Sequence, residues 1–259
     1  MQGIRLEWVT NQIACLTLNK PERGNALNET LMKEFSGYLQ QLTSNLNLRA
    51  LLIQSTGKHF CTGADVHWLK RSLNFSTEEN ILDARLLERL LQQLDEFPVP
   101  VLMIAKGAVF GGALGLLSCA DYVLALEDTR FSFSEALLGL VPAIISPYVV
   151  RAIGLRQARR YMLTAEVFDV QQAIELGLVH QQASESNLDE LRDNWIKLIQ
   201  KTAPHASRKI KSMLTRLSTQ DGLHNEQQTN IQLTSEIRTS SEGQMGLRAF
   251  LEKRPPPWS

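Results

Sequence analysis

The sequence predicts an α/β fold with a largely parallel sheet, followed by an all-helical C-terminal segment. Between residues 4 and 186, short apolar runs alternate with helix-length segments, and strands joined through such crossovers run parallel. From about Asn187 onward the strand-like runs cease and only helical patterns continue. We therefore place a core at 1–190 and a helical segment at 191–259, which suits a chain of 259 residues.

The order of the expected elements follows from apolar periodicity and from capping and breaking residues. Asn28 is a typical N-cap, and Ser76 or Thr77 with a nearby glutamate forms a capping box. Pro98 and Pro100 end the helix that this box opens. In chain order we expect strands at 4–8 and 13–18, a helix at 29–46, a strand at 50–55, a helix from 76 to about 97, a strand at 101–105, a loop at 107–112, a helix at 113–120, and strands at 121–126 and 131–134.

The composition excludes several classes of function. Lys+Arg and Asp+Glu both number 27, so no basic excess points to a nucleic-acid partner, and the basic run at 208–211 suits a solvated helix face. No apolar run is long enough to span a bilayer and the start lacks a signal-peptide pattern, so we expect a cytoplasmic protein without membrane attachment. Cys15, Cys61 and Cys119 have no metal-like spacing and favour buried small hydrophobes.

Two small-residue loops suggest a site for an oxygen that becomes anionic. Gly111-Gly112 precedes a helix, whose first N–H groups lack internal partners and carry partial positive charge. The loop at 60–65 follows a buried strand, and such loops converge at one edge of a parallel sheet. Together they can place two amides on one oxygen, as an oxyanion hole requires. Taken alone, the glycine pair is better explained as a tight turn that packs a buried helix.

Glu135 is the acid–base candidate in this region. If the strand at 131–134 extends to it, period two puts Phe131, Phe133 and Glu135 on one face. Burial on that apolar face would raise the pKa of the carboxyl group and suit it to proton transfer near neutrality. A solvated glutamate at a strand end, or a buried ion pair, remains an equal alternative from these residues alone.

The combination of these motifs resembles the enoyl-CoA hydratase/isomerase (crotonase) superfamily over nearly the whole chain. Their order and spacing carry the resemblance, whereas each motif alone is loose. The matching stretches are 18–21, 25–27, 60–65, 107–112, 131–142, 173–179 and 249–254. The stretches at 63–70, 79–84 and 134–149 look like the bacterial methylglutaconyl-CoA hydratases of leucine and isovalerate breakdown.

The resemblance implies a crotonase-like ββα spiral core that holds the CoA and acyl site at 1–190, with a helical oligomerisation segment at 191–259. The backbone N–H groups of Ala64 and Gly112 match the family's oxyanion-hole donors, and Glu135 matches one of two catalytic glutamates. Gly115 stands where the second glutamate is found. We expect Gly115 to leave room for a branched substrate or an extra water.

The resemblance also implies a binding path for CoA and an assembly. Backbone at Ala26 and at 65–67 (Asp65, Val66 and His67) lies where the family lines the CoA channel. Phe250 and Lys253 match residues that reach the CoA nucleotide, often from a neighbouring subunit. A homotrimer or a dimer of trimers is implied, with an acyl-CoA thioester as substrate and no metal or redox cofactor.

The implied reaction is the addition of water to an enoyl-CoA, with 3-methylglutaconyl-CoA as the expected substrate. Glu135 handles both proton transfers in this hypothesis, or shares them with an ordered water. Lys70, Arg71 and His67 are candidates to pair its terminal carboxylate, although each also suits an ordinary surface position. Because only one carboxylate is retained, an enoyl-CoA isomerase with Glu135 as single base stays open. A non-catalytic CoA-binding homologue stays open for the same reason.

Overall fold

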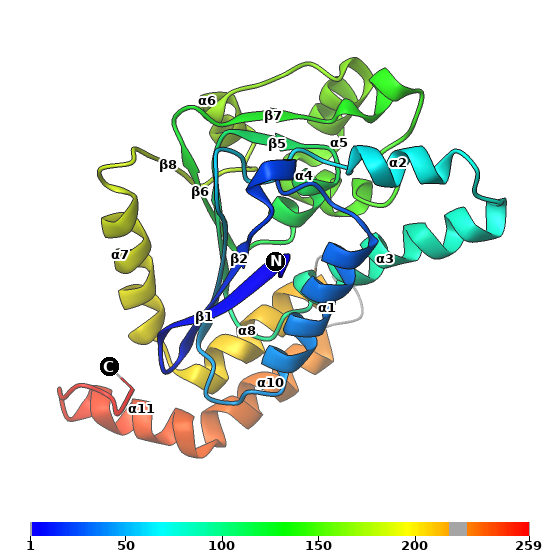
Figure 1. Ribbon diagram of the computed structural model, residues 1–259. Helices are drawn as coiled ribbons and strands as arrows, with labels where there is room; N and C mark the ends of the chain where they lie inside the picture. Colours follow the sequence, from blue (N-terminus) through cyan, green and yellow to red (C-terminus); the bar gives the residue numbers. More distant parts are fainter. Residues whose placement is uncertain (1, 218–226, 259) are drawn as a thin grey trace.

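The centre of the molecule is a six-stranded sheet with the strand order β1-β2-β3-β4-β6-β8, seen in the computed structural model, which describes residues 2–217 and 227–258 (Figure 1). β1 pairs antiparallel with β2, and every later pairing in this sheet is parallel. The predicted α/β class with a largely parallel core is confirmed. The strands span β1 Ile4–Thr10, β2 Ile13–Leu18, β3 Ala50–Ser55, β4 Val101–Ala105, β6 Tyr122–Leu126 and β8 Gln181–Ala183.

Helices cover both faces of the sheet, with α7 on one side and α1, α3 and α4 on the other (Figure 1). The predicted caps are confirmed: the Asn28 side chain accepts a hydrogen bond from the Leu31 N–H, and Ser76 and Glu79 form a capping box. The helices span α1 Glu29–Thr43, α2 Val66–Ser72, α3 Thr77–Asp95, α4 Gly112–Ser118, α5 Ser146–Thr164, α6 Val170–Glu175, α7 Leu188–Gln200, α8 Pro204–Leu217, α10 Gln227–Thr239 and α11 Ser241–Leu251.

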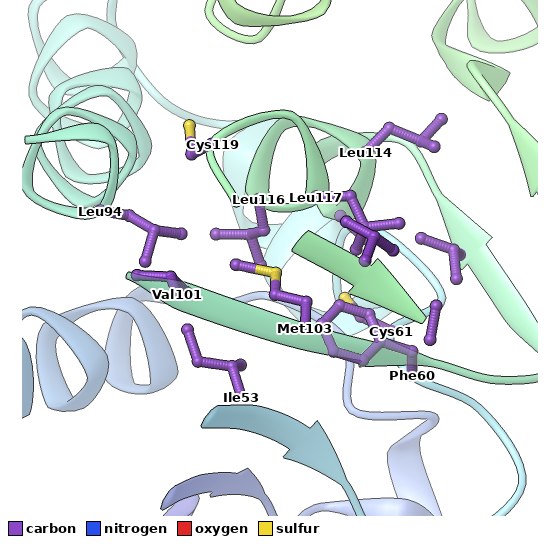
Figure 2. Close-up of a cluster of buried hydrophobic side chains, with 14 of the residues drawn as sticks. Ile53, Phe60, Cys61, Leu94, Val101, Met103, Leu114, Leu116, Leu117 and Cys119 are labelled. Atoms are coloured by element: carbon purple, nitrogen blue, oxygen red, sulfur yellow. The ribbon is translucent and has the colours of Figure 1, made fainter. Parts of the chain in front are cut away.

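The central strands β2, β3, β4 and β6 are buried on both faces because they are mostly apolar, as parallel strands between helices require. Along β4, Val101 and Met103 face the larger core, whereas Leu102 and Ile104 face the smaller one. Figure 2 shows the larger core where Leu116 of α4 lies over Met103 of β4. This packing fixes α4, and with it the N-terminus of α4, on the sheet.

A second, two-stranded parallel sheet differs from the expectation. The segment expected as a loop at 107–112 contains strand β5, Ala108–Phe110, which pairs with β7, Arg130–Ser132. The strand expected at 131–134 therefore ends at Ser132, and a 3-10 turn, Ser134–Leu138, follows. The short β5 is stabilised by pairing with a segment about 20 residues away, which local propensity does not encode.

The C-terminal helices are attached to the sheet through basic side chains. Arg49 donates to the Ile199 carbonyl at 2.9 Å, and Arg208 donates to the Leu48 carbonyl at 2.9 Å. Lys211 is buried and donates to the Val99 carbonyl at 3.1 Å and to Asp121 Oδ2 at 2.5 Å. The expectation of a solvated face at 208–211 is wrong for Arg208 and Lys211, because backbone carbonyls at the base of the sheet attract them.

The smaller core is closed by α7, which buries Trp195 and Ile196 against the sheet. The predicted division at residue 190 falls inside α7, and an assembly role for the segment beyond it stays a prediction. All three cysteines are free and buried, as predicted, and burial raises the pKa of Cys61 to about 12. No helix within residues 2–217 and 227–258 combines the length and apolarity needed to cross a membrane.

The Lys211 contact gives a stability prediction. Lys211→Met should lower the free energy of unfolding by about 3 kcal/mol, because it leaves Asp121 and the Val99 carbonyl without their buried cation. Denaturant unfolding measures the change. Lys209→Met, at an exposed neighbouring position, should stay within about 0.5 kcal/mol of wild type. Equal effects at the two positions would contradict the anchoring role.

Candidate active site

The loop after β3 is held so that one backbone amide is left free. Leu27 N donates to the Gly63 carbonyl at 2.7 Å, and Asp65 N donates to the Leu27 carbonyl at 2.8 Å. Because neighbouring residues in an extended segment direct their amides to opposite sides, Ala64 N–H points away from this bridge. Among the described residues, no hydrogen bond uses the Ala64 N–H.

The second free amide lies at the N-terminus of α4. Gly111 N–H donates to the Ser132 carbonyl at 3.0 Å, which ties the turn to β7. Gly112 is the first residue of α4, so its N–H has no acceptor inside the helix. No acceptor for it occurs elsewhere in the described part of the chain either. The helix end adds partial positive charge to this donor.

A glycine with positive φ precedes each free amide. Gly63 has φ 96° and Gly111 has φ 55°, a region that other residues rarely adopt. A Cβ on Gly63 would lie 3.2 Å from the Phe110 carbonyl oxygen, and one on Gly111 would lie 3.3 Å from Glu135 Oε1. Both turns therefore need glycine for conformation and for space.

Ala64, Gly112 and Glu135 line one cavity of about 540 Å³. Its walls come from the start of α1, α2, α3, α4 and the segment before α5, and they are mostly apolar. Only the side chains of Trp68, Asn80, Asp83 and Glu135 bring polar atoms to it. The remaining lining residues are Leu27, Met32, Leu69, Ala84, Leu87, Leu140, Val141, Pro142, Ala143, Ile144 and Ile145.

Glu135 reaches this cavity from the 3-10 turn after β7, not from a strand. The period-two argument is wrong, because Phe131, Ser132 and Phe133 are all buried and the strand ends before Glu135. The predicted consequence nevertheless holds: burial raises the pKa of the Glu135 carboxyl group. Its Oε2 is buried and has no hydrogen-bond partner within the described residues. A carboxylate oxygen is thus left available beside the two amides.

Gly115 does not leave the space expected of it. A Cβ there would lie 2.5 Å from Ile145 Cγ2 and 3.3 Å from Leu91 Cδ1. Ile145 is only 2% exposed, so its side chain occupies the volume beside Gly115. The expectation of room for a branched substrate or an extra water at this point is wrong. The wall opposite Glu135 is aliphatic instead.

Comparison with known proteins decides the family. The sequence model of the Enoyl-CoA hydratase/isomerase family matches residues 9–259. The chain belongs to this family. Its fold matches the crystal structure of an enoyl-CoA hydratase from Shewanella pealeana, with a TM-score of 0.92, 38% identity, and coverage of 99% of this chain and 96% of the other.

Two curated relatives carry names of different reactions. Enoyl-CoA hydratase AFT6-1 of Alternaria alternata is 30% identical over 240 residues, which cover 92% of this chain and 78% of the relative. Trans-2-decenoyl-[acyl-carrier-protein] isomerase of Streptococcus mutans is 28% identical over 250 residues, which cover 96% and 95%. Members of the crotonase family act on acyl-CoA substrates and are typically oligomeric, and both hydration and isomerisation occur among similar proteins.

Of the predicted CoA-channel residues, Ala26 lines a second, polar cavity of about 510 Å³ near Gln2 and Gly3, whereas Asp65, Val66 and His67 do not. Ala26 lines it together with Lys20 and Arg23. Asp65 is buried, accepts the N–H groups at the start of α2, and lies 3.5 Å from Arg23. Val66 and His67 are exposed at the start of α2. The bridge between Leu27 and Ala64 brings Ala26 close to Asp65, and the role of these residues in a CoA channel stays a prediction.

Phe250 and Lys253 are not brought to this region. Phe250 is 80% exposed on α11, which packs against α8 and α10. Figure 1 shows α11 at the end of the molecule opposite α2 and the outer part of α3. Lys70 and Arg71 are exposed on α2 and do not line the acyl cavity. Among the described residues, no group of His, Cys, Asp or Glu side chains is placed to hold a metal.

Sequence reasoning missed two cavity features. Ile145 was part of a family motif, but nothing in its local sequence indicates that it fills the space at Gly115. The Trp68 indole donates to Asp83 Oδ1 at 2.9 Å, which joins residues of two helices. A pairing 15 positions apart gives no periodic signal, although both residues belong to stretches that the resemblance singled out.

Gly115→Ala should destabilise the protein by about 1–3 kcal/mol, because its Cβ overlaps Ile145. Denaturant unfolding of G115A alone and with Ile145→Ala forms a double-mutant cycle, in which the second change should relieve the cost of the first. Gly37→Ala is the control, because nothing lies within 4 Å of a Cβ at this position of α1. It should raise the free energy of unfolding by about 1 kcal/mol, since alanine favours the helix over glycine. Stabilisation by both alanines would refute the steric account.

Glu135→Gln should stabilise the protein near pH 7, with a gain that disappears as the pH falls below 4.5, the ordinary glutamate pKa. The sign follows from the raised pKa: between 4.5 and the raised value the folded state holds more protons, so stability falls as pH rises. Urea unfolding at pH 4 and pH 7 measures the difference. The exposed Glu190→Gln should stay within about 0.5 kcal/mol at both. A gain at both pH values for E135Q would argue against desolvation.

Proposed function

We propose that this protein adds water reversibly across the double bond of an enoyl-CoA, with 3-methylglutaconyl-CoA as the candidate substrate. One observation carries the proposal: the partnerless Oε2 of Glu135 lies in the same cavity as the free amides of Ala64 and Gly112. A carboxylate for proton transfer and two donors for a thioester oxygen are the groups that this addition requires.

The two amides polarise the substrate. When water attacks Cβ of the enoyl thioester, negative charge moves to the thioester oxygen, and the N–H groups of Ala64 and Gly112 stabilise that enolate. Removing one such donor typically costs about 3 kcal/mol in the transition state. Because both donors are backbone amides held by neighbouring hydrogen bonds, they need no rearrangement when the charge develops.

Glu135 carries the protons. Its carboxylate takes a proton from water as the oxygen bonds to Cβ, and it then delivers a proton to Cα, which restores the ionised form. Burial raises the pKa of Glu135 toward the range in which both steps run well near neutrality. With Ile145 beside Gly115, one carboxylate serves both steps.

The branched substrate is supported by the apolar walls of the acyl cavity and by the sequence motifs of the methylglutaconyl-CoA hydratases. Its terminal carboxylate needs a cation or water. Lys70, Arg71 and His67 on α2 are the candidates from the sequence. All three are exposed and none lines the acyl cavity, so pairing with them would need that end of the acyl chain to extend toward solvent.

Isomerisation is the second candidate, and the aliphatic wall at Ile145 favours it. A single base that removes a proton from one carbon and returns it to another needs no second carboxylate. The Streptococcus mutans relative is named as an isomerase. A non-catalytic CoA-binding role is the third, since one of the two expected glutamates is absent.

For CoA we propose that the backbone at Ala26 and at 65–67 lines the channel, and that Phe250 and Lys253 act from a neighbouring copy in a homotrimer or a dimer of trimers. The exposure of Phe250 and the position of α11 opposite the cavity support a contribution between copies. The reaction is proton transfer on a CoA thioester and uses no metal or redox cofactor.

Turnover in oxygen-labelled water tests the reaction. With 3-methylglutaconyl-CoA, crotonyl-CoA and a 3-enoyl-CoA as substrates, hydration places the label in the product, whereas isomerisation shifts the double bond without it. Glu135→Gln should lower kcat by about 10²–10⁴-fold, with Glu190→Gln as the control. Unchanged hydration by E135Q would remove Glu135 from the mechanism, and CoA binding without turnover by wild type would favour the non-catalytic role.

A further inference from the structure

Helix α2 follows directly on the free amide of Ala64, yet it is weakly attached to the body of the protein. None of its seven residues is buried. Figure 1 shows α2 and the first turns of α3 extending away from the sheet. A helix without a buried face has little packing to hold it in place. The position of α2 therefore depends on a few specific hydrogen bonds.

At its start α2 is held by Asp65. This buried carboxylate accepts the His67 N–H at 2.8 Å and the Trp68 N–H at 3.1 Å, and Arg23 lies 3.5 Å from it. These contacts, together with an interaction of Asp65 with the Asn28 side chain at the start of α1, fix the first turn but do not connect α2 to α3. The connection is made by Trp68, whose Nε1–H donates to Asp83 Oδ1 on α3 at 2.9 Å.

Asp83 lies in the second turn of α3, about two turns before the part of this helix that is buried in the core. Residues four apart share one helix face, so Leu87 and Leu91 continue the stripe that Asp83 begins. Leu91 is fully buried, and the Leu87 side chain lies 3.5 Å from the position of a Cβ on Gly112. The helix that carries Asp83 is thus packed against the residue that supplies the second free amide.

We propose that the Trp68–Asp83 hydrogen bond is a latch that holds α2 on α3 and keeps the Ala64 N–H directed at the same point as the Gly112 N–H. Trp68 and Asp83 are positioning residues, and the catalytic part of the inference rests on the proposed function of the two amides. Both residues also line the acyl cavity, so the latch closes the cavity wall between α2 and α3.

The surroundings favour a strong bond at this point. Trp68 and Asp83 are each half-buried among the apolar cavity residues, where little water competes for the carboxylate. Asp83 has two alternative roles in the cavity, as a second acid–base group or as a charge that selects substrates. Both need its carboxylate, so the Asp83→Asn variant distinguishes them from the latch.

Limited trypsin digestion tests the latch without any substrate. Lys70 and Arg71 are exposed on α2, and cleavage there needs local opening of the helix. Trp68→Phe and Asp83→Ala each remove one partner of the bond and should speed cleavage at these sites at least tenfold. Asp83→Asn keeps an oxygen acceptor and should cleave within threefold of wild type, as should Arg85→Ala on the exposed side of α3. Unchanged cleavage in W68F and D83A would overturn the proposal.

Kinetics with an enoyl-CoA substrate test the effect on the site. W68F and D83A should each lower kcat at least tenfold, whereas D83N should keep kcat within threefold of wild type. The kcat of the W68F/D83A double variant should be no lower than that of the less active single variant, because both changes break the same bond. If D83N is as impaired as D83A, Asp83 acts through its charge and the latch is wrong. Thermal unfolding midpoints show whether a variant is folded. If the Asp83 variants are not folded, the kcat of W68F alone tests the latch. Failure of the proposed function shows as a lack of turnover by wild type and leaves the digestion result intact.

Discussion

The whole site depends on two backbone amides that the fold leaves without internal acceptors. Buried or partly buried amides are normally paired, so free ones persist only where neighbouring hydrogen bonds fix the backbone around them. Leu27 provides that constraint beside Ala64, and the Gly111 N–H bond to Ser132 provides it beside Gly112. Because these partners come from the segment before α1 and from β7, the arrangement of the two free amides depends on the assembled fold and not on either loop alone.

Gly115, which the resemblance aligns with a second glutamate, has no free volume beside it. The volume is taken by Ile145, which comes from the segment before α5 and closes the core there. A methyl-lined wall cannot order water by hydrogen bonding, so the polar side-chain atoms of the cavity come from Glu135, Trp68, Asn80 and Asp83. In the proposed mechanism Glu135 does the acid–base work, and its pKa is raised by burial in these surroundings.

The sequence alone predicts most of the fold, because apolar runs and caps are local signals. The bounds expected for Ile13–Leu18, Ala50–Ser55 and Val101–Ala105 agree with the structure. The predictions that were wrong depend on contacts between residues far apart in the sequence. β5 pairs with β7, Lys211 donates hydrogen bonds to Asp121 and to the Val99 carbonyl, and Ile145 packs against Gly115. The pKa of Glu135 is raised as predicted, although the prediction assumed a strand position that Glu135 does not occupy. It held because burial is the main cause of the shift in either position.

The parallel sheet separates the chemistry of this protein from the attachment of its C-terminal helices. The loops that carry Ala64 and Gly112 follow the carboxyl ends of β3 and of the β4–β5 segment, where parallel strands gather their functional loops. The basic anchors act at the opposite edge: Arg49 precedes β3, while Lys211 contacts Val99 before β4 and Asp121 before β6. Arg208 and Lys211 hold α8 at this edge, and α11 packs against α8, so α11 lies away from the acyl cavity of its own chain. The proposed contact of α11 with the nucleotide of CoA is therefore a contact with the cavity of another copy of the chain.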